Sequence, residues 1–216
     1  MFMKVSPSVL TADFLNLEDK LNSFRKAGTD YLHIDVMDGM FVPNISFGVP
    51  VIKSIAAHTD IPLDIHLMIE SPKRYIKDFA PYAHFLNIHF EAEERPEDVL
   101  KEIRALGCRP AITIKPKTKP SEIFHLLPLV DMVLVMSVEP GFGGQAFMPD
   151  ALDKLRVLKQ EAESQGLKIE LEVDGGVNSE TAPLCAKAGA TILVAGSFLF
   201  NAEDTEAAVA ELKKLG

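Results

Sequence analysis

The sequence predicts an α/β fold, a single-domain (β/α)8 TIM barrel that spans residues 1–216. The chain length of 216 residues suits one large domain and is too short for two comfortable ones. Apolar segments alternate with amphipathic ones along the whole chain, and the apolar segments are hydrophobic at nearly every position, as in parallel strands covered on both faces. Eight strand–helix pairs joined by short connections favour the barrel.

The main alternative is a doubly wound open sheet. Such a sheet usually has fewer strands, and its dinucleotide-binding form carries G-x-G-x-x-G after the first strand. Here the first predicted strand is followed by Thr11-Ala12-Asp13, which contains no glycine. The barrel is therefore the favoured architecture.

Each predicted strand is a short run rich in Val, Ile and Leu. Each predicted helix has apolar residues at helical spacing, and several begin at a proline or are followed by a glycine, which suit those positions. The predicted strands cover residues 4–9, 31–36, 62–67, 85–89, 110–114, 131–136, 168–173 and 191–195. The predicted helices cover residues 13–27, 49–57, 72–80, 96–106, 120–127, 149–165, 179–188 and 204–215.

Composition and charge narrow the function classes. Apolar residues make up 47% and charged residues 25% of the chain, as in ordinary globular proteins. The net charge of −9 argues against a nucleic-acid partner, although backbone amides could still hold a small phosphorylated substrate. No leader-like segment or bilayer-length apolar run is seen, so we expect a cytoplasmic protein without a membrane partner. Cys108 and Cys185 have no disulfide or metal spacing, and we expect both to pack as small apolar groups.

Polar residues stand at the carboxyl ends of several predicted strands, where barrel enzymes carry their active sites. His33 and Asp35 lie two apart and share a face of the second strand, His66 ends the third strand, and Asp174 ends the seventh. Burying such groups costs several kcal/mol unless they are paired or bound to a metal. Buried, hydrogen-bonded core residues are the alternative, but four groups converging on one barrel mouth favour a metal.

Two histidines and two carboxylates suit Zn²⁺ best, with Fe²⁺, Mn²⁺ or Co²⁺ as alternatives. Asp64 and Glu172 lie one step deeper and could orient the ligands. We expect the remaining histidines to lie in helices or loops as solvated groups, apart from His89 at the end of the fourth strand. These solvated histidines are His58, His84 and His125.

A second group of residues points to a phosphate. Glycines follow the sixth, seventh and eighth predicted strands, and glycine lets the backbone present N–H groups to an anion. Any one of these glycine pairs could be a simple turn, but loops after the last strands are the frequent phosphate site of this fold. The candidate residues are Gly141, Phe142, Gly143, Gly144, Gly175, Gly176, Gly196 and Ser197. Methionines at strand ends either fill the core or line the site; they are Met37, Met68 and Met136.

Taken together, these motifs resemble the ribulose-phosphate 3-epimerase family over essentially the whole chain. The matching stretches are residues 6–14 (SPSVLTADF), 33–39 (HIDVMDG), 41–44 (FVPN), 64–68 (DIHLM), 135–145 (VMSVEPGFGGQ), 172–177 (EVDGGV) and 195–197 (AGS). After the fifth strand many members carry Asn-Pro-x-Thr, whereas this chain has Lys115-Pro116-Lys117-Thr118, which leaves the role of Lys115 open.

The resemblance implies a metal-dependent enzyme of the pentose phosphate pathway that interconverts D-ribulose 5-phosphate and D-xylulose 5-phosphate. It implies one divalent ion held by His33, Asp35, His66 and Asp174, with Asp35 and Asp174 as the acid/base pair. Ser8 and His66 would also contact the phosphorylated ketose, and the phosphate would lie against the glycines of the last three loops. Relatives are commonly dimers or hexamers, so a homo-oligomer is expected.

Three other functions stay open from the sequence. A D-allulose-6-phosphate 3-epimerase would use the same parts on a longer sugar. A Schiff-base aldolase would use Lys115 as its nucleophile and no metal. A sugar-phosphate-binding protein without catalysis would not need the acid/base and metal residues.

Overall fold

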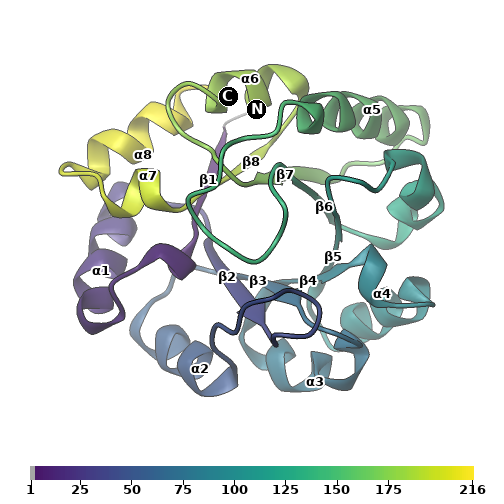
Figure 1. Cartoon of the computed structure of the whole chain (residues 1–216), viewed down its shortest axis with the longest axis horizontal. Helices are drawn as coiled ribbons and strands as arrows, with labels where there is room; N and C mark the ends of the chain where they lie inside the picture. The colour runs from purple at the N-terminus through teal and green to yellow at the C-terminus, as the bar shows by residue number, and fades with distance from the viewer. Residues whose placement is uncertain (1–2) are drawn as a thin grey trace.

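Eight parallel strands form one continuous sheet in the computed structural model, which describes residues 3–216 (Figure 1). The strand order is β1-β8-β7-β6-β5-β4-β3-β2, so every strand lies beside its neighbour in the chain. The two ends of this order meet through a parallel bridge between Ser8 and His33, which nearly closes the barrel. Helices surround the strands in Figure 1, and the predicted TIM barrel is confirmed.

The strands agree closely with the predicted segments. They are β1 (Lys4–Pro7), β2 (Leu32–Met37), β3 (Leu63–Met68), β4 (Ala83–His89), β5 (Arg109–Ile114), β6 (Met132–Met136), β7 (Glu170–Asp174) and β8 (Ile192–Ala195). The α-helices are α1 (Leu17–Ala27), α2 (Val49–His58), α3 (Ile76–Phe79), α4 (Pro96–Ala105), α5 (Asp150–Ser164), α6 (Ala182–Ala188), α7 (Ser197–Phe200) and α8 (Thr205–Lys213). The short 3₁₀ segments are η1 (Val9–Thr11), η2 (Phe14–Asn16), η3 (Pro72–Arg74), η4 (Ala80–Tyr82), η5 (Phe90–Ala92) and η6 (Pro120–Leu129).

Several predicted helices differ in the structure. The helix predicted over 72–80 is divided into η3, α3 and η4, and the one over 120–127 is the 3₁₀ segment η6, which contains Pro128. Proline supplies no N–H for a continuous α-helical ladder. The helix predicted from 179 begins only at Ala182, because the Asn178 side chain accepts the N–H groups of Glu180 and Thr181 in a turn. The four-residue α7 is absent from the predicted helices.

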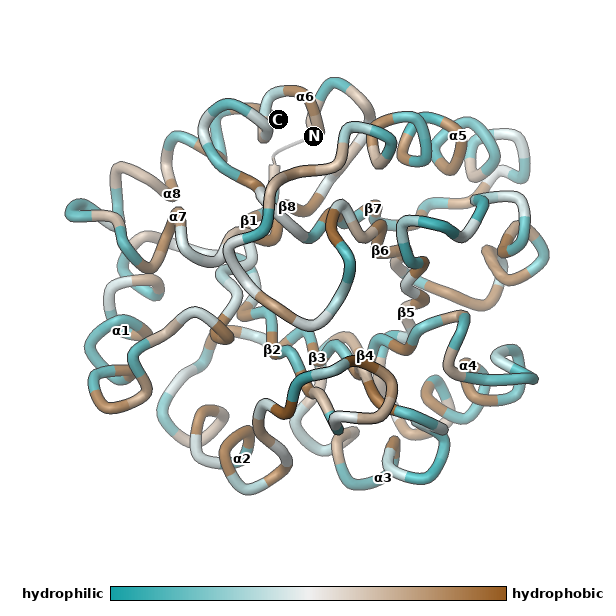
Figure 2. The backbone as a smooth tube through the Cα atoms, in the orientation of Figure 1, coloured by the Kyte–Doolittle hydropathy of each residue, from teal (hydrophilic) through white to brown (hydrophobic). Residues whose placement is uncertain are grey.

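The barrel separates apolar from polar side chains. Residues that point outward from the strands, such as Ile34, Ile65 and Leu86, are fully buried beneath the surrounding helices. Figure 2 shows hydrophobic and hydrophilic residues alternating along those helices, as one-sided burial requires. On the inner side, an apolar cluster that includes Phe85, Met132 and Ile192 packs near the amino ends of the strands. Inward positions nearer the carboxyl ends of the strands are therefore free to carry polar groups.

Three of the smaller expectations can also be compared with the structure. Cys108 and Cys185 are free and buried, and burial raises the pKa of the Cys185 thiol to about 12, as suits a packing residue. His58 and His125 are exposed as expected, but His84 lies on β4, half-buried, with its ring stacked on Tyr31. Within residues 3–216, no helix has the length and hydrophobicity needed to cross a membrane.

The packing of α1 supplies a test of the fold. Phe24 is fully buried, and its ring meets that of Phe200 edge to face with centroids 5.0 Å apart. We expect Phe24→Ala to lower the free energy of unfolding by about 3–5 kcal/mol through lost burial and a residual cavity. Urea denaturation measures it, with Leu15→Ala as the control, because Leu15 is 94% exposed. Equal stabilities for the two variants would contradict this packing.

Candidate active site

A pocket of about 590 Å³ opens at the carboxyl ends of the strands. It is the end at which barrel enzymes carry their active sites. In Figure 1 the segment between β6 and α5 crosses the view in front of the barrel centre. The pocket is lined by many of the residues singled out from the sequence: Ser8, Asp35, Met37, Met68, Met136, Gly141, Phe142, Gly143, Gly144, Asp174, Gly175, Gly176, Gly196 and Ser197.

Four side chains that could bind a metal, those of His33, Asp35, His66 and Asp174, lie close together in the barrel. The Nε2 atom of His33 lies 3.2 Å from Nδ1 of His66, 3.4 Å from Oδ1 of Asp35 and 3.9 Å from Oδ2 of Asp174. Oδ1 of Asp35 lies 3.5 Å from Nδ1 of His66. Metal–ligand bonds of about 2.1 Å in a tetrahedral site would place the ligands about 3.4 Å apart, so the cluster has the size that a divalent ion needs.

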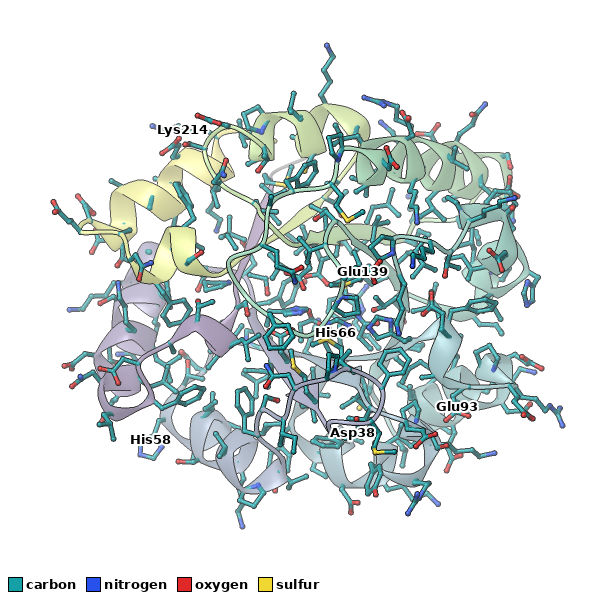
Figure 3. The ribbon with its side chains drawn as sticks, viewed as in Figure 1. Asp38, His58, His66, Glu93, Glu139 and Lys214 are labelled. Carbon is teal, nitrogen blue, oxygen red and sulfur yellow. The ribbon has the colours of Figure 1, made fainter. Side chains whose placement is uncertain are left out.

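Strand geometry explains why these side chains meet. His33 and Asp35 lie two apart on β2 and share its inner face. In the parallel register Asp35 pairs with His66 on β3, and His33 pairs with Asp64. Figure 3 shows His66 near the centre of the barrel, whereas His58 lies at the rim. The cluster is therefore a direct product of inward-facing positions on β2, β3 and β7.

The two pocket carboxylates have opposite tendencies to ionise. Burial raises the pKa of Asp35. The charge of His33 and hydrogen bonds to both imidazoles lower this pKa by a larger amount, so the net pKa is well below its usual value. Burial raises the pKa of Asp174 to about 6, and the charge of Asp35 adds to the rise although His33 opposes it. In the metal-free protein Asp35 is thus held ionised, while Asp174 titrates at a pH of about 6.

Beneath the cluster, a carboxylate holds His33 from behind. Oδ2 of Asp64 lies 2.5 Å from Nδ1 of His33, and both side chains are fully buried. Burial lowers the pKa of His33, but the charges of Asp35 and Asp64 more than offset it, so the net pKa is well above its usual value. Burial and then the charge of Asp64 raise the pKa of Glu172 well above its usual value, which favours the neutral acid. The placement suits the orienting role expected for Asp64.

On the opposite side, the structure brings in two residues to which the sequence analysis gave no role. Nε2 of His89 lies 2.9 Å from Nε2 of His66, and Nδ1 of His89 lies 3.3 Å from Oε2 of Glu91. Oε1 of Glu91 accepts the backbone N–H of Lys115 at 2.8 Å and the hydroxyl of Thr118. The one available signal was the His-x-Glu spacing at the end of the fourth strand.

These two residues also titrate away from their usual ranges. Burial lowers the pKa of His89 to about 3. Burial raises the pKa of Glu91, but hydrogen bonds from His89, Thr118 and the Lys115 backbone offset it, and the net pKa is about 2. At neutral pH the pair is a neutral imidazole beside a carboxylate.

Two loops meet beside the pocket. Nδ2 of Asn44, in the loop after β2, donates to the carbonyl of Gly141, in the loop after β6, at 2.7 Å. The Phe41 ring lies against His89 with centroids 4.7 Å apart, and Nζ of Lys115 lies 3.6 Å from the centre of the Phe41 ring. The Lys115 ammonium therefore contacts an aromatic face.

The loop after β7 requires glycine at two positions. Gly175 and Gly176 have φ angles of +119° and +63°, a region that other residues rarely adopt. A Cβ on Gly175 would lie 2.6 Å from Val138, and one on Gly176 would lie 2.6 Å from the Phe147 backbone nitrogen. These glycines let the loops after β6 and β7 pack closely together at the pocket wall.

Comparison with known proteins identifies the family to which the sequence is similar. Residues 4–200 match the model of the ribulose-phosphate 3 epimerase family. Proteins named ribulose-phosphate 3-epimerase are 44% identical in Mycobacterium tuberculosis over 211 residues (97% of this chain, 91% of that one) and 44% identical in Bacillus subtilis over 213 residues (98% of each). A rice protein named as the cytoplasmic isoform is 40% identical over 216 residues, which cover 98% of this chain and 93% of that one.

Solved structures support the fold alone. A 3-hexulose-6-phosphate synthase superposes with a TM-score of 0.70 at 18% identity, covering 99% of both chains. A Streptococcus mutans protein titled KGPDC superposes with a TM-score of 0.74 at 12% identity, covering 100% of this chain and 97% of that one. The family itself is established by the sequence matches over nearly the full length: the chain belongs to the ribulose-phosphate 3-epimerase family and is an enzyme of that family.

Proposed function

We propose that the protein interconverts D-ribulose 5-phosphate and D-xylulose 5-phosphate, with Asp35 and Asp174 as the acid/base pair. The observation that carries the proposal is the pair of carboxylates, Asp35 on β2 and Asp174 on β7, that both line the pocket. In the metal-free protein the pKa of Asp35 is lowered and that of Asp174 is raised. Titratable pairs whose environments push their pKa values apart are the usual basis of acid/base assignments. Family membership supplies the substrate class.

The two carboxylates suit epimerisation because they stand on different strands. Inverting C3 of a ketose phosphate requires one group to remove a proton from one face and another to deliver a proton to the opposite face. Asp35 lies near the carboxyl end of β2 and Asp174 ends β7, and both line the same pocket. The ionised carboxylate takes the C3 proton while the protonated one donates, and the roles exchange in the reverse direction.

We further propose that His33, Asp35, His66 and Asp174 hold one divalent ion. The donor atoms lie within 4.8 Å of one another, and nitrogen and oxygen donors of this kind suit Zn²⁺ first, then Fe²⁺, Mn²⁺ or Co²⁺. When bound, such an ion acts as a Lewis acid that stabilises the negative charge developing on the sugar oxygens.

The rest of the pocket fits a phosphorylated sugar. The glycine-rich loops after β6, β7 and β8 line one wall, where backbone N–H groups could hold the phosphate. Ser8 Oγ donates to Oδ2 of Asp35 at 2.6 Å, so the hydroxyl stands next to the reacting group. Met37, Met68 and Met136 line the pocket and would keep the reacting carbon away from water.

Two alternatives receive less support. A Schiff-base aldolase would need the Lys115 amine free in the pocket, but it lies against Phe41. A D-allulose-6-phosphate 3-epimerase would share the same chemistry, and relative rates on the two substrates distinguish the two enzymes.

We also propose a cytoplasmic location and a homodimer or hexamer. Cell fractionation tests the location, and the mass in solution tests the oligomeric state.

Removing the titratable oxygen of Asp174 tests the two-carboxylate mechanism. Asp174→Asn should still bind the substrate but lose turnover by at least about 10²–10⁴-fold, the usual contribution of a general acid or base. The measurement is a coupled assay of D-ribulose 5-phosphate conversion, with metal content determined in the same samples. Asp19→Asn, on the exposed surface of α1, is the matched control. A near-normal rate for Asp174→Asn would rule the mechanism out.

Metal removal tests the cation site. Dialysis against a chelator should abolish pentulose turnover, and adding back Zn²⁺, Mn²⁺, Co²⁺ or Fe²⁺ should restore it, because the charge formed at the sugar oxygens would otherwise be unstabilised. D-allulose 6-phosphate is assayed alongside. Full activity in protein shown to contain no metal would refute this part of the proposal.

The pKa shifts predict how metal affinity depends on pH. In the metal-free protein Asp174 takes up a proton as the pH falls through about 6, and His33, whose pKa is raised, does so at higher pH. Protons therefore compete with the metal ion for the same groups. As the pH is lowered, the affinity for the metal should fall by about tenfold per pH unit for each proton that the metal must displace. Chelator-competition titrations between acidic and alkaline pH measure it; an affinity that does not change with pH would contradict the ligand set.

A further inference from the structure

Behind His66, hydrogen bonds run away from the pocket through His89 to Glu91. The two Nε2 atoms of His66 and His89 are 2.9 Å apart, so one nitrogen must donate a proton and the other must accept it. A neutral imidazole carries one N–H, so the direction of this bond decides which nitrogen of His66 keeps its lone pair. If His89 donated, the proton of His66 would lie on Nδ1 and point at His33 and Asp35.

Glu91 decides the direction. Its Oε2 lies 3.3 Å from Nδ1 of His89, and an ionised carboxylate only accepts hydrogen bonds. The proton of His89 is therefore on Nδ1, its Nε2 accepts, and His66 donates from its own Nε2. Nδ1 of His66 is left with a free lone pair, 3.2 Å from Nε2 of His33 and 3.5 Å from Oδ1 of Asp35.

We propose that Glu91 is a positioning residue that acts through His89 to fix the proton of His66 on Nε2, leaving Nδ1 free to bind a cation. The inference rests on the metal site proposed above. It gives His66 the support that Asp64 gives directly to His33, and outer partners of this kind set the tautomer and orientation of metal-binding histidines.

The surroundings hold this relay in one arrangement. Oε1 of Glu91 is occupied by the Lys115 N–H and the Thr118 hydroxyl, so Oε2 is the oxygen left for His89. Nζ of Lys154 donates to the carbonyls of Lys115, Pro116 and Thr118 and fixes the loop that carries those donors. His89 itself is fully buried, with the Phe41 ring against it.

The sharpest test is Glu91→Gln. The amide oxygen can still accept from Lys115 and Thr118, which turns the amide NH₂ toward Nδ1 of His89. His89 must then accept at Nδ1 and donate from Nε2, and the proton of His66 moves to Nδ1. Glu94→Gln is the matched control: it makes the same change in the same loop, and Glu94 is exposed, with no hydrogen bond or ion pair to residues 3–216.

Two readouts are made on metal-free protein checked for cooperative unfolding. Nitrogen NMR of labelled histidines should report His66 protonated on Nε2 in the wild type and Glu94→Gln, and on Nδ1 in Glu91→Gln. Affinity for Zn²⁺, measured by chelator competition, should fall about 10- to 100-fold in Glu91→Gln, the usual effect of losing an outer partner. It should be unchanged in Glu94→Gln.

The outcomes separate the two proposals. A wild type with His66 protonated on Nδ1 overturns the relay whether or not Glu91→Gln folds. An unchanged His66 tautomer and Zn²⁺ affinity in a folded Glu91→Gln variant also overturns it. If the wild type binds no Zn²⁺, the metal part of the proposed function fails, while the tautomer measurement on metal-free protein still decides whether Glu91 directs the proton of His66.

Discussion

The structure depends on one constraint: two imidazoles and two carboxylates point their lone pairs at a common centre inside a barrel. Such groups repel one another when all are in the form that binds a cation, and burial removes the water that would otherwise weaken the repulsion. In the metal-free protein burial and the charge of Asp35 raise the pKa of Asp174, and the charges of Asp35 and Asp64 raise the pKa of His33, so bound protons reduce the conflict. A divalent ion would satisfy all four groups at once, so the arrangement favours a cation over any uncharged occupant.

The barrel accommodates this cluster because the two faces of its sheet carry different kinds of residue. Outward positions on every strand are apolar and covered by helices, and they form the main hydrophobic core of the protein. Parallel register then places inward residues of neighbouring strands side by side, as with Asp35 and His66. Because the polar residues lie near the carboxyl ends, Asp35 and Asp174 of the cluster line the pocket, whereas His33 and His66 are fully buried.

Much of this could be predicted from the sequence, because strands and their faces depend on local alternation. The four clustered residues could be grouped from spacing and from the rule that strand ends meet. Segments such as 72–82 were harder, because prolines and turn hydrogen bonds decide between α-helix and 3₁₀ helix within a few residues. The role of Glu91 could not be predicted, because it depends on hydrogen bonds from Lys115 and Thr118, which lie in the loop after the next strand.

The two histidines of the cluster are held in different ways, and the difference has a physical reason. Asp64 stands directly behind His33, where its charge raises the pKa of that imidazole. A carboxylate equally close to His66 would add another negative charge to a site that already holds Asp35 and Asp174. Placing the neutral His89 between His66 and Glu91 keeps the direction of the hydrogen bond while moving the charge outward. The structure thus fixes the position of the proton on each imidazole by a different arrangement of carboxylates.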